Sequence, residues 1–464
     1  MRREARWALP VGLLAIPLGG IALAGDLRAR PGQYLCLHAA AFALFLVAAR
    51  AARLLPAGRG GTLRVVVVAA LFRALLVAAP PTLSEDVYRY VWDGRVQLAG
   101  VNPYLYPPDS PVLQSLRDAN WEAINHKDIP TIYPPLQQLF SRAVAAVSPT
   151  VVAFKLAFCG VDLGLVLLLG SLLRSRGVGP AALVLYAWNP LVVVEVAASG
   201  HADPLAALFT VLALAAIAGE RPRLSALAWG AAVLAKVWPL ALAPVLWRRL
   251  PARRMWPALL LVGVAFIPFA AAGGGVFAGL GAYGQRWQSN ELAFGGILRG
   301  VAWLDPTEAL KGGVTWIRSW FGYSERLSFA YAWTDPQHVA RAVTLLVLAA
   351  VIAWVAMRER STSRAFLLVI VSLLLLSPTI HPWYLLWAAP LLPLHPSRGL
   401  LLWTALAPLA YLLQPLSAAG SPWAAIVPWL EYLPVLAGFA LDLRRGPLEI
   451  GGVGTALAPR GAIE

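Results

Sequence analysis

Long apolar stretches separated by short charged segments run through the whole sequence, and this alternation limits the folds that the chain can adopt. A helix needs about 20 consecutive apolar residues to cross a bilayer. Stretches close to this length lie near 7–25, 33–54, 62–80, 150–173, 181–199, 203–219, 255–272, 338–357, 365–381, 383–395, 399–416 and 424–443. Only 13% of the 464 residues are charged, against about 25% in a soluble domain. The sequence therefore predicts an all-α polytopic membrane protein of about 12 transmembrane helices, in which residues 1–464 form a single integral-membrane domain.

The basic residues predict how these helices are oriented, because cytoplasmic loops of membrane proteins are enriched in Lys and Arg. When Arg2, Arg3 and Arg6 are placed on the inner side, successive membrane crossings bring most other basic loops to that side as well. These loops contain Arg50, Arg53, Arg59, Arg64, Arg174, Arg176, Arg221, Arg223, Arg358, Arg360, Arg364, Arg444 and Arg445. Arg28 and Arg30 are weak exceptions. The net charge of +15 is spread over such loops without a long basic run, so it indicates topology and not nucleic-acid binding.

Two long segments, 81–149 and 273–337, are predicted on the outer face. The first is expected to contain an interfacial helix over 135–148. The second is rich in tryptophan, which favours the membrane interface, and 316–321 is typical of a helix that lies on the surface. This second segment serves either as an anchor or as a platform for a lipid-linked substrate or a sugar ring.

The segment 224–247 departs from the zigzag because basic residues flank both of its ends. Its two halves are short for a membrane crossing, and Lys236 and Pro239 lie near its middle. Proline disfavours a continuous helix. We therefore expect either a re-entrant helical hairpin with Lys236 at its apex, pointing into a cavity, or two thin spans from which Lys236 extends to the membrane surface.

A cluster of ionisable residues follows the third apolar stretch and contains Glu85, Asp86, Arg89, Asp93 and Arg95. Placing a charge near hydrocarbon costs several kcal/mol, roughly 2.5 to 3.5 on insertion scales, so such clusters commonly mark functional sites. Glu85 and Asp86 offer a general base or a metal ligand, and burial beside the bilayer raises the pKa of a carboxyl group. The alternative is an interfacial loop whose charges are solvated.

Other polar groups fall on the same predicted side of the membrane. His201 and Asp203 lie between two apolar stretches, and His381 lies at the end of another. Together with the acidic cluster they suggest one outward-facing site that could bind phosphate or hydroxyl groups. Two structural roles compete with this interpretation. Asp203 followed by Pro204 suits a helix N-terminus, and a single His at the end of a span is often structural.

The sequence lacks the motifs of several other enzyme classes. It contains no Walker A loop, no glycine-rich dinucleotide turn after a strand and no HExxH motif. Cys36 and Cys159 both lie within apolar stretches, so no disulfide framework and no cysteine metal site is predicted. Nucleotide-driven chemistry therefore has no visible site.

Seven short motifs occur along the sequence, and together they form a specific set. They are Ser84-Glu85-Asp86-Val87-Tyr88-Arg89-Tyr90, Asp93-Gly94-Arg95, Asn102-Pro103-Tyr104, Tyr133-Pro134-Pro135, Ser199-Gly200-His201-Ala202-Asp203, Ala235-Lys236-Val237-Trp238-Pro239 and His381-Pro382-Trp383-Tyr384. In this order they resemble the GT-C glycosyltransferases over roughly 81–390. Within that group the chain looks like bacterial polyprenol-phosphate-mannose-dependent mannosyltransferases and, more distantly, the catalytic subunit of GPI mannosyltransferase I. The acidic pair here is Glu-Asp where the family has Asp-x-Asp.

The resemblance implies a GT-C-like bundle that transfers a hexose, here mannose, with inversion. The donor would be a polyprenyl-phosphate sugar and the acceptor a lipid or glycan, at the outer face of a bacterial plasma membrane. Asp86 would be the base, with Glu85 as a supporting ligand or alternate base. Residues expected at the donor phosphate are Arg89, Lys236 and His381, and those expected in the substrate pocket are Asp93, Arg95, Tyr133, His201, Asp203 and Tyr384. No cofactor is implied with certainty, and a divalent metal at Glu85 and Asp86 is left open.

The competing function is a membrane transporter or a flippase for lipid-linked sugars. Lys236 in a broken hairpin fits the discontinuous helix of a transporter. Against this, the sequence shows no internal repeat at matching positions, and both long segments lie on one side. A non-catalytic scaffold would not need clustered outer carboxylates.

Overall fold

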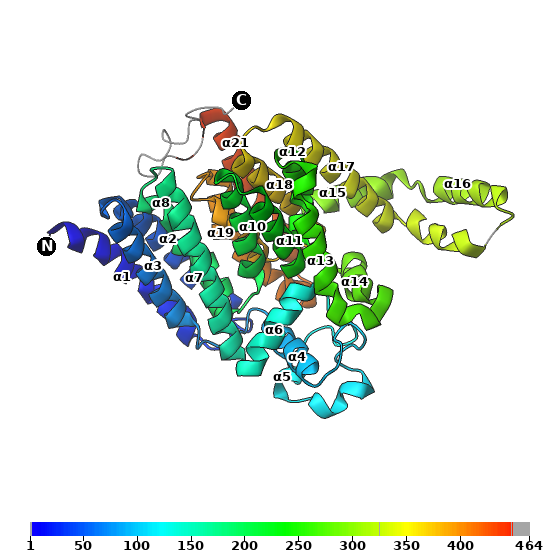
Figure 1. Ribbon diagram of the computed structural model, residues 1–464, viewed down its shortest axis with the longest axis horizontal. Coiled ribbons are helices and arrows are strands. Elements are labelled where there is room, and N and C mark those ends of the chain that lie inside the picture. Colours follow the sequence, from blue (N-terminus) through cyan, green and yellow to red (C-terminus); the bar gives the residue numbers. More distant parts are fainter. Residues whose placement is uncertain (1, 324, 447, 449–464) are drawn as a thin grey trace.

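The computed structural model describes residues 2–323, 325–446 and 448, and within these residues the chain is mostly helical and forms no β-strand. The side chains of 2–5 and 326, including those of Arg2 and Arg3, lie outside the described part. A single isolated bridge joins Ser289 and Thr379. The helices form a bundle with the N-terminal helices along one side (Figure 1). The predicted all-α fold is confirmed.

Most of the bundle consists of helices that begin with a capping residue or a proline in the first turn, where proline's missing N–H costs nothing. Thr150 caps α7, and Asp335 caps α17. The longer helices are α1 (Arg2–Leu23), α2 (Pro31–Ala51), α3 (Arg59–Leu76), α7 (Val151–Ser175), α10 (Asp203–Ala218), α17 (Pro336–Arg358), α18 (Thr362–Leu376) and α21 (Trp423–Arg445). The shorter ones are α8 (Pro180–Ala187), α9 (Pro190–Val193), α13 (Trp256–Phe266), α15 (Ala293–Leu304), α19 (Arg398–Leu406) and α20 (Leu413–Ala418).

Several of these helices have the length and composition of membrane spans. Within the described residues seven helices qualify, or eight if the pair Pro180–Ala187 and Pro190–Ala198, bent by 52°, counts as one span. The helices α10 and α18 are apolar but shorter. A multi-pass membrane protein follows from these helices, while the total of about 12 spans stays a prediction.

One predicted span is wrong. The stretch 383–395 is not a single helix, since it contains the 3₁₀ turns Pro382–Trp387 and Ala389–Leu391. Proline at 382, 390 and 393 removes backbone donors that a continuous helix would need. These turns are nearly all buried, so they form part of the bundle interior and not a lipid-facing helix.

The segment 224–247 is broken at the expected position. Helix α11 (Pro222–Ala235) ends one residue before Lys236, whose backbone is extended with φ −156° and ψ 147°. A 3₁₀ turn (Trp238–Leu242) and helix α12 (Ala243–Arg249) follow. Neither helix is long enough to qualify as a span, which favours the hairpin over two complete crossings.

One end of the bundle is built from α4 (Asp86–Leu98), α5 (Ala119–Glu122), α6 (Pro135–Val147) and α14 (Ala278–Arg286), which gather at the bottom of Figure 1. Helix α6 confirms the helix predicted over 135–148. It packs tightly on α4, because a Cβ at Gly94 would lie 2.5 Å from the carbonyl oxygen of Ser141. Helix α16 (Thr307–Trp320) instead projects away from the bundle and has no buried residue.

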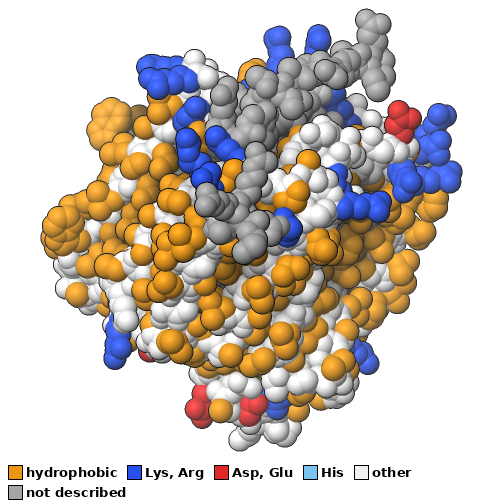
Figure 2. Space-filling view, turned by 90° about the vertical axis from the view of Figure 1, so that its left-hand side faces the viewer, with side chains coloured by type: hydrophobic (Ala, Val, Ile, Leu, Met, Phe, Trp, Pro, Cys, Tyr) orange, Lys and Arg blue, Asp and Glu red, His pale blue; other side chains and the backbone are white. Residues whose placement is uncertain are grey.

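The charged side chains are distributed unevenly over the surface. In Figure 2 most Lys and Arg side chains gather near the upper end, a broad hydrophobic belt crosses the middle, and acidic side chains appear mostly near the lower end. A hydrophobic belt is the expected surface of a protein embedded in a bilayer, and a basic end is expected to face the cytoplasm. The orientation inferred from the basic loops stays a prediction.

Candidate active site

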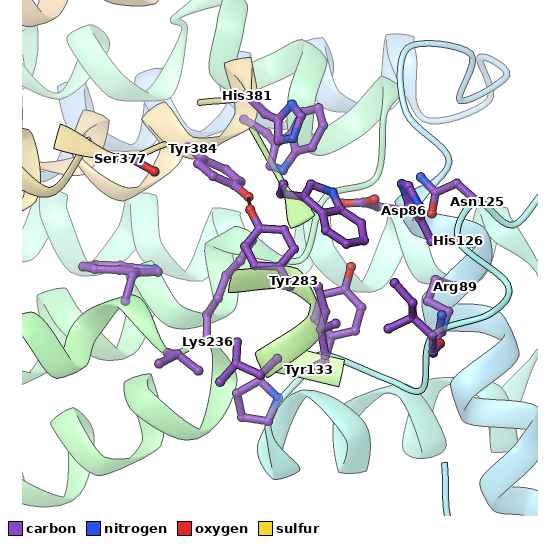
Figure 3. A pocket seen from close by; sticks show the side chains of 18 of the residues that line it. Asp86, Arg89, Asn125, His126, Tyr133, Lys236, Tyr283, Ser377, His381 and Tyr384 are labelled. Carbon is purple, nitrogen blue, oxygen red and sulfur yellow. Dashed lines mark hydrogen bonds between the residues drawn. The ribbon is translucent and has the colours of Figure 1, made fainter. Parts of the chain in front are cut away.

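A cavity of about 260 Å³ lies where the first long segment, the break after α11, helix α14 and the turn Pro382–Trp387 meet (Figure 3). Its polar and ionisable lining consists of Asp86, Arg89, Asn125, His126, Tyr133, Lys236, Tyr283, Ser377, His381 and Tyr384. Much of the remaining wall is aromatic or aliphatic, a composition typical of a pocket for an organic ligand. Six predicted site residues therefore share one cavity: Asp86, Arg89, Tyr133, Lys236, His381 and Tyr384.

Asp86 is the first residue of α4, and its backbone N–H donates to the hydroxyl of Ser84 at 3.3 Å. One carboxylate oxygen lies 3.6 Å from Nδ1 of His201. Burial is the largest influence on this carboxyl group and raises its pKa, while the nearby His201 and Lys236 act in the opposite direction. A carboxylate whose pKa is raised is a better proton acceptor, as a general base requires.

Glu85 points to a different part of the molecule. It forms an ion pair with Arg28, and its other oxygen accepts a hydrogen bond from Asn125 at 3.3 Å. It does not line the cavity. The pair explains why Arg28 departs from the charge rule for loops, because Arg28 neutralises a carboxylate next to the site. Glu85 thus fastens the loop before α4 to the α1–α2 connection.

Lys236 extends into the cavity from the break after α11 (Figure 3). Its ammonium donates to Asp203 at 2.6 Å, and the same oxygen accepts from the indole N–H of Trp387 at 2.5 Å. Asp203 is fully buried at the first turn of α10, where the helix dipole favours a carboxylate. The ammonium also lies 5.4 Å from the ring centre of Tyr384, within the range of a cation–π contact. The cation is therefore held in place before any ligand binds.

Aromatic side chains next to Lys236 form one wall of the cavity. His381 stacks on Trp383 with ring centres 4.3 Å apart and planes 4° apart. The hydroxyl of Tyr384 is hydrogen-bonded to that of Tyr283 on α14. This bond joins helix α14 to the turn that carries His381, so the second long segment contributes a wall of the cavity.

Two other predicted pocket residues hold the scaffold together. Asp93 is buried and accepts hydrogen bonds from Arg89 at 2.9 Å, Thr131 at 2.5 Å and Gln138 at 2.8 Å. Arg95 pairs with Asp118 at 2.5 Å near the surface. Neither Asp93 nor Arg95 lines the cavity, so their expected place in the substrate pocket is not supported. Asp93 contacts Arg89, which does line it.

His201 does not line the cavity and is fully buried. The residue before it, Gly200, has φ +77°, and a Cβ there would lie 2.8 Å from Cγ of Lys155 and 3.1 Å from Cγ2 of Val87. Glycine therefore lets this turn approach α4 closely enough to place His201 against Asp86. His201 and Asp203 contact lining residues without lining the cavity themselves.

Comparison with protein-family models decides the class of this site. Residues 9–250, more than half of the chain, match the family described as Alpha-(1->6)-mannopyranosyltransferase, N-terminal domain. The chain belongs to this family. Residues 131–378 also match glycosyltransferase family 87. No curated protein matches the chain in sequence. The protein is a membrane glycosyltransferase, which acts on a sugar donor and an acceptor, as the resemblance to GT-C enzymes implied.

The acidic pair of the glycosyltransferase does not fit a joint metal site. The two carboxylates face different partners, since Glu85 is paired with Arg28 and Asp86 faces His201. A divalent cation needs several oxygen ligands that converge on one point. Within the described part of the chain, no group of three or more His, Cys, Asp or Glu side chains is placed to hold a metal ion.

Several residues of the glycosyltransferase site were not foreseen from its sequence. Asn125, His126 and Tyr283 line the cavity, and His126 packs against Trp287 with ring centres 4.3 Å apart. Trp287 was expected only as one of the interfacial tryptophans. The adjacent polar residues Asn125 and His126, in a segment predicted at the outer face, could have indicated a binding site. Tyr283 belongs to no recognisable motif.

Proposed function

We propose that the protein transfers mannose from a polyprenyl-phosphate carrier to a hydroxyl group of a lipid or glycan acceptor, at the outer face of the membrane and with inversion. The observation that carries this proposal is the presence of Asp86 and Lys236 in one cavity with aromatic walls. A base and a fixed cation are the two groups that such a transfer needs from the protein.

In the proposed reaction the acceptor oxygen attacks the anomeric carbon while Asp86 takes the hydroxyl proton. A new carbon–oxygen bond forms on one face of the sugar, and the bond to the carrier phosphate breaks on the other. The leaving polyprenyl phosphate keeps the electron pair. One attack of this kind inverts the configuration at the anomeric carbon.

The leaving phosphate is proposed to bind near Lys236, His381 and Arg89, all of which line the cavity. A compact ammonium suits a phosphate as a point charge. Asp203 and Trp387 keep the Lys236 side chain in position, so little rearrangement is needed when negative charge develops on the phosphate. Trp383, Tyr384 and Trp387 supply aromatic surface against which a sugar ring can lie.

The outer location follows from the charge rule and can be tested by labelling. In a variant without Cys36 and Cys159, single cysteines at Asn120 and Leu310 should react with a membrane-impermeant thiol reagent added to spheroplasts. A cysteine at Ala252 should react only after lysis. Labelling at 252 with protection at 120 would reverse the orientation and place the site at the inner face.

The direct test incubates purified protein in nanodiscs with radiolabelled polyprenyl-phosphate mannose and a membrane lipid extract. We expect labelled product, no product from a nucleotide-linked mannose, and an anomeric configuration opposite to that of the donor. Transfer from the nucleotide sugar would contradict the carrier, and a retained configuration would contradict the single displacement.

A further inference from the structure

A buried chain of polar groups lies behind Asp86, and the reaction described above makes no use of it. The two ring nitrogens of His201 face two different carboxylates. Nδ1 lies 3.6 Å from Asp86, and Nε2 lies 3.4 Å from Glu195. Catalytic hydrogen bonds are often this long without substrate and shorten in the reacting complex. The imidazole therefore joins the proposed base to a second carboxylate.

Glu195 is fully buried, and burial makes an unpaired carboxylate costly. One of its oxygens accepts a hydrogen bond from the hydroxyl of Tyr411 at 2.8 Å. The other has no hydrogen-bond partner in the described part of the chain and faces the imidazole. A positive charge on the imidazole would be attracted to this carboxylate, because opposite charges interact strongly in a buried site.

The backbone around Glu195 is unusual in a way that serves this contact. Val194–Ala198 forms a π-helical turn, a rare element that is frequent at functional sites. The backbone carbonyl of Glu195 accepts the N–H of His201 at 3.1 Å. Trp383 stacks on the His201 ring with centres 4.1 Å apart and planes 15° apart. The backbone of His201 is thus held by a hydrogen bond, and its imidazole ring is held by the stacked Trp383.

We propose that Glu195 is a positioning residue that orients His201 and stabilises the imidazolium formed when His201 receives the proton from Asp86. This inference rests on the proposed function, in which Asp86 is the base. The proton moves from a carboxylate oxygen of Asp86 to Nδ1 of His201, and Asp86 regains its charge. After the product leaves, the proton returns by the same route to water in the cavity.

The test compares two substitutions that separate charge from packing. Glu195→Gln keeps the size of the side chain and an acceptor for Tyr411 but removes the charge, whereas Glu195→Asp keeps the charge on a shorter side chain. We expect Glu195→Gln to lower kcat roughly 10- to 100-fold, the range for outer partners that orient a functional imidazole. The KM for the donor should not change, because Glu195 does not line the cavity. Glu195→Asp should retain more activity than Glu195→Gln.

A double-mutant cycle locates the effect at His201. In a His201→Gln background, the further change Glu195→Gln should cost little, since the two residues act as a unit. Wild-type kcat in Glu195→Gln, or higher activity in Glu195→Gln than in Glu195→Asp, would overturn the inference. If Glu195→Gln does not fold, His201→Gln takes its place, and wild-type kcat in that variant overturns the inference in the same way.

Asp86→Asn in the same series keeps the two proposals distinguishable. If Asp86→Asn is inactive and Glu195→Gln is fully active, the assignment of Asp86 as the base stands and only the role of Glu195 is rejected. An active Asp86→Asn removes the base itself, and with it the proposed reaction.

Discussion

The two long segments on the predicted outer face, 81–149 and 273–337, are built in different ways. The first is held by a buried network in which Asp93 accepts hydrogen bonds from three side chains of the same segment. The second begins with α14, which lines the cavity, but continues into α16, where no residue is buried. One segment is a scaffold along its length, while the other joins the site only at its start.

This difference between the two segments indicates which parts of the site must be positioned precisely. A general base must lie within hydrogen-bond reach of the proton it removes, and displacement by about 1 Å can cost roughly 100-fold in rate. The segment that carries Asp86 is accordingly fixed by buried polar contacts. A wall that only encloses substrate tolerates more freedom, and Tyr283 is held by a hydrogen bond to Tyr384 and a ring contact with Trp287.

The largest expected effect concerns the base in the first segment. Asp86→Asn removes the charge with almost no change in volume and should lower kcat about 10²- to 10⁴-fold, the usual contribution of general-base catalysis. Glu85→Gln is the matched control, because Glu85 precedes Asp86 but does not line the cavity, and its carboxylate is paired with Arg28. Radiometric transfer assays on both variants decide the assignment. Greater loss in Glu85→Gln than in Asp86→Asn would move the base to Glu85.

A second prediction tests whether the phosphate is bound by Lys236, which belongs to neither long segment. Lys236→Met removes the ammonium and should weaken binding of the polyprenyl-phosphate donor roughly 10- to 150-fold, which corresponds to about 1.5 to 3 kcal/mol for a charge-assisted hydrogen bond. Lys311→Met is the control, since Lys311 is exposed on α16, pairs with Glu308 at 2.9 Å and does not line the cavity. Binding of free acceptor should change in neither variant. Equal donor affinity in Lys236→Met and wild type would remove Lys236 from the site.

The pH dependence of transfer gives a third prediction. Burial raises the pKa of Asp86, and Lys236 partly opposes this rise. Because the base must be ionised, kcat/KM should fall as the pH decreases through a value above the ordinary carboxyl pKa of 3.8. Lys236→Met removes a cation that favours the ionised form, so its acidic limb should lie at higher pH than that of wild type. A limb that moves to lower pH would contradict the proximity of the two groups.

The scaffold itself can be tested through the Arg89–Asp93 pair. Asp93→Asn leaves the buried Arg89 without its ionic partner and should lower the free energy of unfolding by roughly 3 to 5 kcal/mol, as for other broken buried pairs. Asp118→Asn breaks the more exposed pair with Arg95 and should cost less than about 1 kcal/mol. Chemical unfolding of both variants in detergent provides the measurement. Equal costs would show that the first segment is not held by its buried network.

The sequence was informative about the fold because hydrophobic length and charge distribution act locally along the chain. It predicted the break at Lys236, because the two short apolar halves of 224–247 and the proline at 239 can be recognised without tertiary information. It could not separate Asp86 from Glu85, because the difference lies in Arg28, which is far away in sequence. The stretch 383–395 was mistaken for a span because apolar residues buried in the protein interior resemble residues that face lipid.

Side-chain roles in the site were harder to predict than positions. The resemblance implied a place in the pocket for Asp93 and Arg95, but on α4 both side chains contact structural partners. Glu195 precedes His201 by six residues, but the sequence predicted no role for it. Its contact with His201 depends on a π-helical turn. Such a turn has no clear signal in a single sequence.

The smallest effect is expected at the far end of the second segment. Trp316 lies on α16 with 59% of its surface exposed, and it packs edge-on against Trp320 with ring centres 4.3 Å apart. A tryptophan so placed suits the membrane interface, where its ring anchors a surface helix. Trp316→Ala should therefore leave kcat and the donor KM close to wild type while reducing quenching of tryptophan fluorescence by brominated lipids. Tyr283→Phe, at the start of the same segment, is the comparison, because it removes a hydrogen bond at the cavity and should affect transfer more. A larger loss of transfer in Trp316→Ala than in Tyr283→Phe would mean that α16 receives a substrate, and that both segments take part in the reaction along their whole length.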